Sequence, residues 1–125
     1  MAALPVVRVS DAVTAARAAE NLLRSGAFGL IAMDFGGAGD VELRIGDLGR
    51  LIKLAQRHDA AVVCITKKSN GSPSLGSMVS LRAEALRLRG RDAGGGYATT
   101  IRVLKDKRHG PGWTSTTRRR GLAGF

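Results

Sequence analysis

A short apolar run that ends in a carboxylate constrains the fold of this chain more than any other stretch. Residues 29–34 read Gly-Leu-Ile-Ala-Met-Asp, and the glycine-rich segment 35–39 follows directly. A continuously apolar run of this length is typical of a strand buried on both faces, in a parallel sheet with helices packed on either side. Ligands of open α/β sheets bind beyond the carboxyl ends of such strands, where Asp34 would lie. Asp34 is therefore a candidate binding residue, and the alternative is that it only caps the turn into the glycine segment.

The first half of the chain predicts strands and helices in alternation. The expected elements are a strand over residues 4–9, a helix stopped by Gly26, the strand at 29–34, a helix opened by Asp47, and a fully buried strand over residues 60–66. Ser10 is a good N-cap for the first helix, and Asp11 favours the positive end of its dipole. His58 is expected to cap the C-terminus of the second helix rather than to act in catalysis. This order predicts right-handed βαβ crossovers and a parallel sheet.

The pattern changes after the third predicted strand. Residues 67–74 form a polar, basic loop that cannot continue a strand. The elements expected next are a helical turn over residues 75–79, a strand through 83–89, a glycine turn at 92–96, a hairpin partner at 97–106, a Gly-Pro-Gly turn at 110–112 and a last strand at 113–118. Residues 77–91 fit helical spacing nearly as well as strand alternation. Residues 118–125 are expected to form a basic, flexible tail.

The positive charge of the chain lies in its second half. Residues 1–60 hold seven basic and seven acidic side chains, whereas residues 61–125 hold thirteen and three, which accounts for the whole net charge of +10. This asymmetry favours a polyanionic partner, with nucleic acid ahead of an anionic membrane or an acidic protein. The alternative is a basic surface that serves only solubility.

The remaining composition predicts a cytoplasmic protein that holds no cofactor. The one cysteine, Cys64, lies inside an apolar run, so it is expected to be a buried structural thiol with no disulfide partner in the chain. No apolar run approaches the roughly 20 residues that cross a bilayer, and the N-terminus lacks the layout of a signal peptide. The sequence predicts no catalytic residue, no metal and no membrane partner.

Taken in order, these segments resemble the second half of the RecA recombinase core, and more closely the ImuA (SulA-like) proteins of bacterial SOS mutagenesis. AAENLLRSGAFGLIAMDF is similar to the helix and strand that lead to the family's Walker B aspartate, and AAVVCITKK to the next buried strand. SLRAEALRLRGRD and TTIRVLKDKRHGPGWTSTT are similar to the antiparallel strands around the family's Lys-x-Lys motif. The resemblance covers about residues 11–117. It implies an α/β fold and a single RecA-like domain over residues 1–125. This domain would be a fragment of a three-layer core, in which parallel strands with crossover helices precede antiparallel C-terminal strands.

The motif with which this family holds ATP is missing. RecA-type ATPases bind phosphates in a glycine-rich loop that ends Gly-Lys-Ser or Gly-Lys-Thr, and the sequence contains neither. Asp34 matches the Walker B position, and the resemblance therefore implies a vestigial nucleotide site without ATP hydrolysis by this chain alone. Lys67 stands where the recombinase has a nucleotide-sensing glutamine, and the DNA-binding loop that follows is cut to residues 68–77. Strand exchange is therefore not expected.

The basic residues at strand ends carry the remaining functional prediction. The predicted nucleic-acid-binding residues are Lys67, Lys68, Lys105, Lys107, Arg108, Arg118, Arg119 and Arg120. In one continuous sheet some of these strand ends would lie on one edge and form a phosphate-binding surface. Lys105-Asp106-Lys107 matches the Lys-x-Lys motif, which here serves DNA phosphates or is only a solvated strand end. Trp113, beside this region, either stacks on an unpaired base or packs on a strand face.

The resemblance implies a non-catalytic accessory protein in DNA repair and SOS-induced translesion synthesis. Its expected partners are DNA, single-stranded or duplex and without sequence preference, together with an error-prone polymerase assembly and RecA. The alternatives are a regulator that docks on RecA filaments and the C-terminal half of a split RecA-type ATPase.

Overall fold

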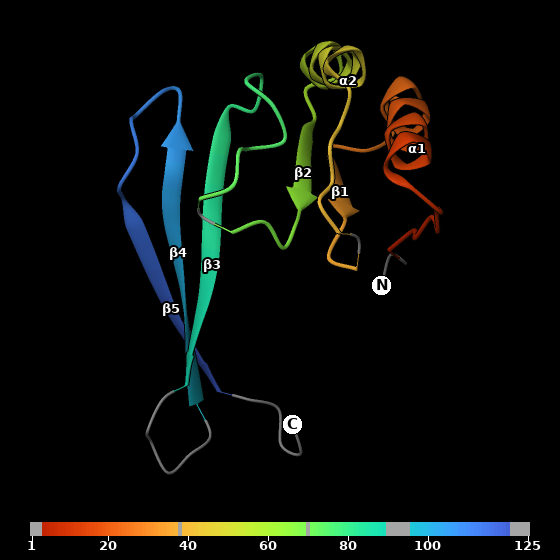
Figure 1. Ribbon diagram of the computed structural model, residues 1–125. Helices are drawn as coiled ribbons and strands as arrows, with labels where there is room; N and C mark the ends of the chain where they lie inside the picture. Colours follow the sequence, from red (N-terminus) through yellow and green to blue (C-terminus); the bar gives the residue numbers. More distant parts are fainter. Residues whose placement is uncertain (1–3, 38, 70, 90–95, 121–125) are drawn as a thin grey trace. The chain divides into compact units, whose positions relative to one another are not determined.

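The computed structural model describes residues 4–37, 39–69, 71–89 and 96–120 (Figure 1). Residues 92–95 of the predicted glycine turn and residues 121–125 of the predicted tail lie outside this range. The chain divides into two compact units, Met1–Met78 and Val79–Phe125, which we call the N-terminal and C-terminal units. The protein is a mixed α/β protein with a two-stranded parallel sheet and a three-stranded antiparallel sheet. None of the described helices is long and apolar enough to cross a membrane.

The N-terminal unit has the predicted helix and strand order from the first helix onward. Its elements are α1 (Ala12–Arg24), β1 (Leu30–Asp34), α2 (Ile45–Arg57) and β2 (Ala61–Ile65). Strands β1 and β2 pair in parallel, with Leu30 opposite Ala61 and Asp34 opposite Ile65. The prediction of parallel strands joined by a crossover helix is therefore confirmed for this pair.

Local hydrogen bonds explain where the two helices begin and end. Asp11, not Ser10, is the N-cap of α1, because its Oδ1 accepts the Thr14 N–H at 2.8 Å while Ser10 Oγ donates to its Oδ2. Gly26 follows α1 with a φ of +68°, which suits glycine and stops the helix as predicted. Helix α2 starts at Ile45, two residues before the predicted Asp47, and its C-cap is His58 as predicted.

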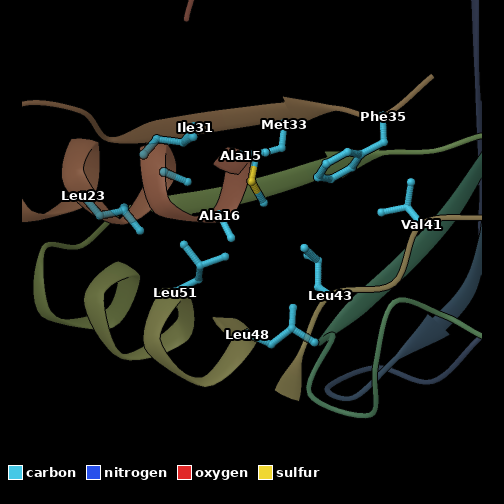
Figure 2. Close-up of a cluster of buried hydrophobic side chains, with 11 residues drawn as sticks. Ala15, Ala16, Leu23, Ile31, Met33, Phe35, Val41, Leu43, Leu48 and Leu51 are labelled. Atoms are coloured by element: carbon cyan, nitrogen blue, oxygen red, sulfur yellow. The ribbon is translucent and has the colours of Figure 1, made fainter. Parts of the chain in front are cut away.

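The hydrophobic core lies on one side of the β1–β2 sheet. Ile31 and Met33 of β1 point toward apolar side chains of both helices (Figure 2). The other buried members of the cluster are Ala15, Ala16, Ala19 and Leu23 of α1, Leu48 and Leu51 of α2, and Phe35, Val41 and Leu43 of the β1–α2 connection. Since α1 and α2 share this cluster, both helices cover the same face, and the prediction of helices on either side is wrong.

The opposite face of β1 and β2 is apolar and exposed. Leu30 is 61% exposed, and Val63 and Ile65 of β2 are 45% and 50% exposed. Successive side chains of a strand point to opposite faces, so these residues share the face away from Ile31 and Met33. The prediction that both strands are buried on both faces is therefore wrong. An apolar run alone does not distinguish one covered face from two.

The predicted strand at residues 4–9 is absent. This segment has no regular secondary structure, and Leu4 and Val6 are 86% and 75% exposed. Its β-branched composition suits a strand, but it pairs with neither β1 nor β2. Without a neighbouring strand, its backbone groups are left to water.

The loop after β2 packs onto α2 without forming the predicted helical turn. Described residues 66–80 contain only turns and bends. Leu75 and Met78 pack against the core cluster. A Cβ added at Gly76 would lie 2.7 Å from Leu48 Cδ1, so a larger residue there would require the Leu48 side chain to shift. The loop is thus held close to the helix at this point.

The C-terminal unit is an antiparallel sheet in the order β3 (Leu81–Arg89), β4 (Gly96–Asp106) and β5 (Thr114–Arg120). The predicted antiparallel pairing of β3 with β4 and the predicted last strand are confirmed, and residues 81–89 form a strand rather than a helix. β5 continues to Arg120, so Arg118–Arg120 belong to a strand and not to the predicted tail. Within the described residues β2 does not pair with this sheet, and the strands form two sheets instead of one continuous sheet.

Candidate nucleic-acid interface

The C-terminal unit holds most of the excess positive charge. Residues 79–125 contain eleven basic and three acidic side chains, a net charge of +8. Two of the three carboxylates lie in the described residues, and both are engaged. Glu84 of β3 forms an ion pair with Arg102 on the adjacent strand β4. Asp106, at the end of β4, organises the turn into β5.

This turn, residues 105–113, is built around the Asp106 carboxylate, and we call it the Asp106 turn. Asp106 Oδ1 accepts the backbone N–H groups of Arg108 at 2.8 Å and His109 at 3.2 Å. His109 Nδ1 lies 3.3 Å from the other carboxylate oxygen. These hydrogen bonds, that of the Arg108 N–H foremost, lower the pKa of Asp106 because they favour its charged form.

Backbone hydrogen bonds close the base of the same turn. Gly112 N–H donates to the Val103 carbonyl, and Val103 N–H donates to the Trp113 carbonyl, each at 3.0 Å. Gly110 and Gly112 have φ values of +79° and +102°, which side-chain-bearing residues rarely adopt. The predicted Gly-Pro-Gly turn is therefore confirmed, and its geometry depends on both glycines.

The basic side chains of the turn are presented to solvent. Lys107, Arg108 and His109 are exposed, Lys105 is half-buried, and Trp113 is 48% exposed. In the part of the chain that the structure describes, neither Lys107 nor Arg108 has an acidic partner within ion-pairing distance. A fixed backbone thus carries unneutralised cations next to an accessible indole ring, which is the chemistry of a single- or double-stranded nucleic-acid contact.

A second basic group lies at the other end of the sheet. Arg118 and Arg119 of β5 are exposed and pair with Ala98 and Tyr97 of β4. The Arg87 guanidinium of β3 lies over the Tyr97 ring, 4.2 Å from its centroid. At about 3.4 Å per residue, seven residues of β4 separate Ala98 from Lys105 by roughly 24 Å. The predicted residues of this unit therefore form two groups, one at each end of β4, with Arg120 paired to Gly96 in the second.

Lys67 and Lys68 lie in the N-terminal unit, just beyond β2. Lys68 lines a shallow pocket of about 220 Å³ together with Asp40 and Glu42. The two carboxylates offset its charge, so this pocket is not suited to a phosphate group. β2 and β4 belong to different sheets. Lys67 and Lys68 therefore do not share a sheet edge with Lys105 and Lys107, contrary to the prediction.

Asp34 ends β1, where the sequence placed it, and its side chain closes the following turn. Its Oδ1 accepts the Gly36 N–H at 2.8 Å, and a Cβ at Gly36 would lie 3.0 Å from this oxygen. This is the turn-capping alternative for Asp34. Asp34 does not line the pocket that contains Lys68.

Cys64 lies half-buried on the core side of β2. Burial raises the pKa of the Cys64 thiol, because removal from water disfavours the thiolate. A raised pKa suits a structural thiol rather than a nucleophile.

Sequence reasoning missed three residues of the candidate interface. Arg87 and Tyr97 meet only because of the β3–β4 register, which no local pattern encodes. Asp106 was noted only as the middle residue of Lys-x-Lys. An aspartate just before a basic turn that contains Gly-Pro-Gly is a signal for a side chain that binds the turn's N–H groups, and it could have identified Asp106. The sequence matches no known protein-family model, and no curated protein matches it closely enough to count as a relative.

Proposed function

We propose that this protein is a non-catalytic accessory factor in DNA repair and damage-induced translesion synthesis, and that it binds nucleic acid through its C-terminal unit. The observation that carries the proposal is the Asp106 turn, in which a fixed backbone presents unneutralised Lys107 and Arg108 beside Trp113. The net charge of +8 on residues 79–125 supports a polyanionic partner.

The order of the elements supports a RecA-like core fragment similar to ImuA. Two parallel strands with a crossover helix precede antiparallel strands, in the order in which the similar segments occur in that family. On this proposal the partners besides DNA are an error-prone polymerase assembly and RecA. The turn-capping role of Asp34 and the missing Gly-Lys-Ser/Thr loop support a protein that does not hydrolyse ATP by itself.

Binding to phosphates through a few cations predicts weak, sequence-independent affinity that falls steeply with salt. Each phosphate contact contributes about 0.7 to 0.9 to the slope of log affinity against log salt concentration. Replacing both Lys107 and Arg108 with alanine should therefore lower the slope by about 1.4 to 1.8. The measurement is the fluorescence anisotropy of labelled oligonucleotides at several salt concentrations.

The matched control is the double replacement of Lys53 and Arg57 with alanine. Both residues are exposed on α2 of the N-terminal unit, and their replacement removes the same charge as the replacement of Lys107 and Arg108. The control should bind with an unchanged slope. Equal losses of oligonucleotide affinity in the two double variants would show that only net charge matters. If neither variant loses affinity, DNA is rejected as the partner of this turn.

The exposed apolar face of β1 and β2 favours a second candidate, the C-terminal half of a split RecA-type ATPase. Parallel sheets normally have both faces covered, and here Leu30, Val63 and Ile65 are exposed. A separate chain that supplies the phosphate loop would cover this face. Co-expression with an adjacent reading frame that encodes Gly-Lys-Ser or Gly-Lys-Thr should then give ATP hydrolysis that neither chain shows alone. A co-purified but inactive pair rejects this candidate.

A further inference from the structure

We propose that the Asp106 turn selects single-stranded over duplex nucleic acid, by stacking an unpaired base on Trp113 while Lys107 and Arg108 bind the adjacent phosphates. The inference rests on the proposed nucleic-acid binding of the C-terminal unit and specifies the form of nucleic acid that this site takes.

Trp113 has a fixed backbone and an accessible side chain. Its carbonyl accepts the Val103 N–H at 3.0 Å, and its indole lies on the side of Asp106, where it contributes to lowering the pKa of that carboxylate. Nevertheless the residue is 48% exposed. A buried structural tryptophan would hide most of its surface, whereas this residue leaves about half of its surface to solvent. Because the backbone of Trp113 is already fixed by hydrogen bonds, stacking a base on its ring requires little further ordering of the chain.

The charges around Trp113 favour the backbone on either side of a stacked base. The Asp106 carboxylate is occupied by N–H groups of its own turn, so its charge faces inward. Lys107 and Arg108 are exposed and form no ion pair within the described part of the chain. Aromatic stacking with cations nearby is the general way in which proteins bind single strands without reading their sequence.

Duplex nucleic acid can use only part of this site. Its bases are paired and stacked on one another, so they offer no free face to the indole. A duplex can therefore bind Lys107 and Arg108 through its phosphates but gains nothing from Trp113. The preference for single strands should equal the contribution of one stacked base, which alanine substitution in other proteins puts at about 5- to 150-fold in affinity.

The experiment uses Trp113 as its own reporter, since it is the one tryptophan in the chain. Titration of the full chain with an unlabelled oligothymidylate should quench the tryptophan fluorescence, and the same length of duplex should bind without comparable quenching. Trp113→Leu should lower single-strand affinity at least fivefold and leave duplex affinity within twofold. Trp113→Phe keeps an aromatic ring for stacking, so it should retain most of the single-strand affinity.

Each other outcome has a definite meaning. If Trp113→Leu weakens single strands and duplex equally, Trp113 only supports the turn, and the inference is overturned. If single strands bind but neither quench the fluorescence nor respond to Trp113→Leu, the inference is also overturned while the proposed function stands. If the parent chain binds no nucleic acid at low salt, the proposed function itself fails. Far-ultraviolet circular dichroism of each variant establishes that the sheet is intact.

Discussion

A single carboxylate, that of Asp106, sets the conformation of the basic turn. It accepts hydrogen bonds from two backbone N–H groups and, in one tautomer or when protonated, from the His109 ring. These contacts engage the carboxylate within its own turn. Lys107, which follows Asp106 in the sequence, stays exposed and forms no ion pair within the described residues.

The lowered pKa of Asp106 makes the turn sensitive to acid. A carboxylate whose pKa is lowered by folding stabilises the folded state fully above its unfolded pKa, near 4, and this contribution is lost as the pH falls through the lowered folded value. The fluorescence of Trp113 should therefore change as the pH falls below about 4.

The control for this prediction is Asp106→Asn, whose amide oxygen can accept the same backbone N–H groups but does not titrate. The parent should show a step in tryptophan fluorescence below about pH 4, and Asp106→Asn should show none. Asp11 also has a pKa lowered by the Thr14 N–H, but it caps α1 in the N-terminal unit and has no tryptophan beside it. A step of equal size in Asp106→Asn would assign the acid transition to another carboxylate.

At the scale of elements, the core depends on which face of each helix and strand is covered. Leu23 of α1 is fully buried, whereas Leu30 of β1 is 61% exposed. Leu23→Ala should lower the free energy of unfolding by about 2 to 5 kcal/mol, because it removes buried surface and leaves a cavity. Leu30→Ala should change it by no more than about 0.5 kcal/mol. Thermal unfolding followed by circular dichroism compares the two variants.

Both variants remove the same side-chain atoms, one set from a buried position and the other from an exposed position. If Leu30→Ala is as costly as Leu23→Ala, then the outer face of β1 is covered in solution. The assignment of a single covered face to the β1–β2 sheet would then be wrong.

Sequence patterns identified elements better than they identified faces. Helical spacing and stop signals placed α1 and α2 within two residues, because caps and glycines act locally. The apolar run of β1 could not reveal its exposed side, since Leu30 and Ile31 are both apolar while only Ile31 is buried. The segment 4–9 has strand composition but no strand partner, and partners are a property of the whole fold.

For the molecule as a whole, the sequence predicted the chemistry of the candidate interface but not its geometry. The cations, Trp113 and the Gly-Pro-Gly turn are visible as residues, and charge asymmetry indicated the half of the chain that carries them. Which of them meet depends on pairing between distant strands, such as Tyr97 with Arg119. Lys67 and Lys68 share no sheet edge with Lys105, because the strands form two sheets where one was expected.

Buried side chains are divided very unequally between the two units. Of the described hydrophobic residues that are buried, only Val103 belongs to the C-terminal unit, and the others form the cluster between α1, α2 and β1. A three-stranded sheet with so little buried surface has little stability of its own. We therefore expect two denaturant transitions rather than one. Trp113 fluorescence should report the first, and alkylation of the half-buried Cys64 thiol the second.

Two transitions mean that no single melting temperature describes this protein. A ligand stabilises only the state that binds it, so a bound oligonucleotide should move the tryptophan transition to higher denaturant and leave the thiol transition where it is. Coincident transitions that shift together would show instead that the units unfold as one cooperative body. In that case the N-terminal unit, which holds most of the buried side chains, would stabilise the C-terminal sheet in the folded state that binds the oligonucleotide.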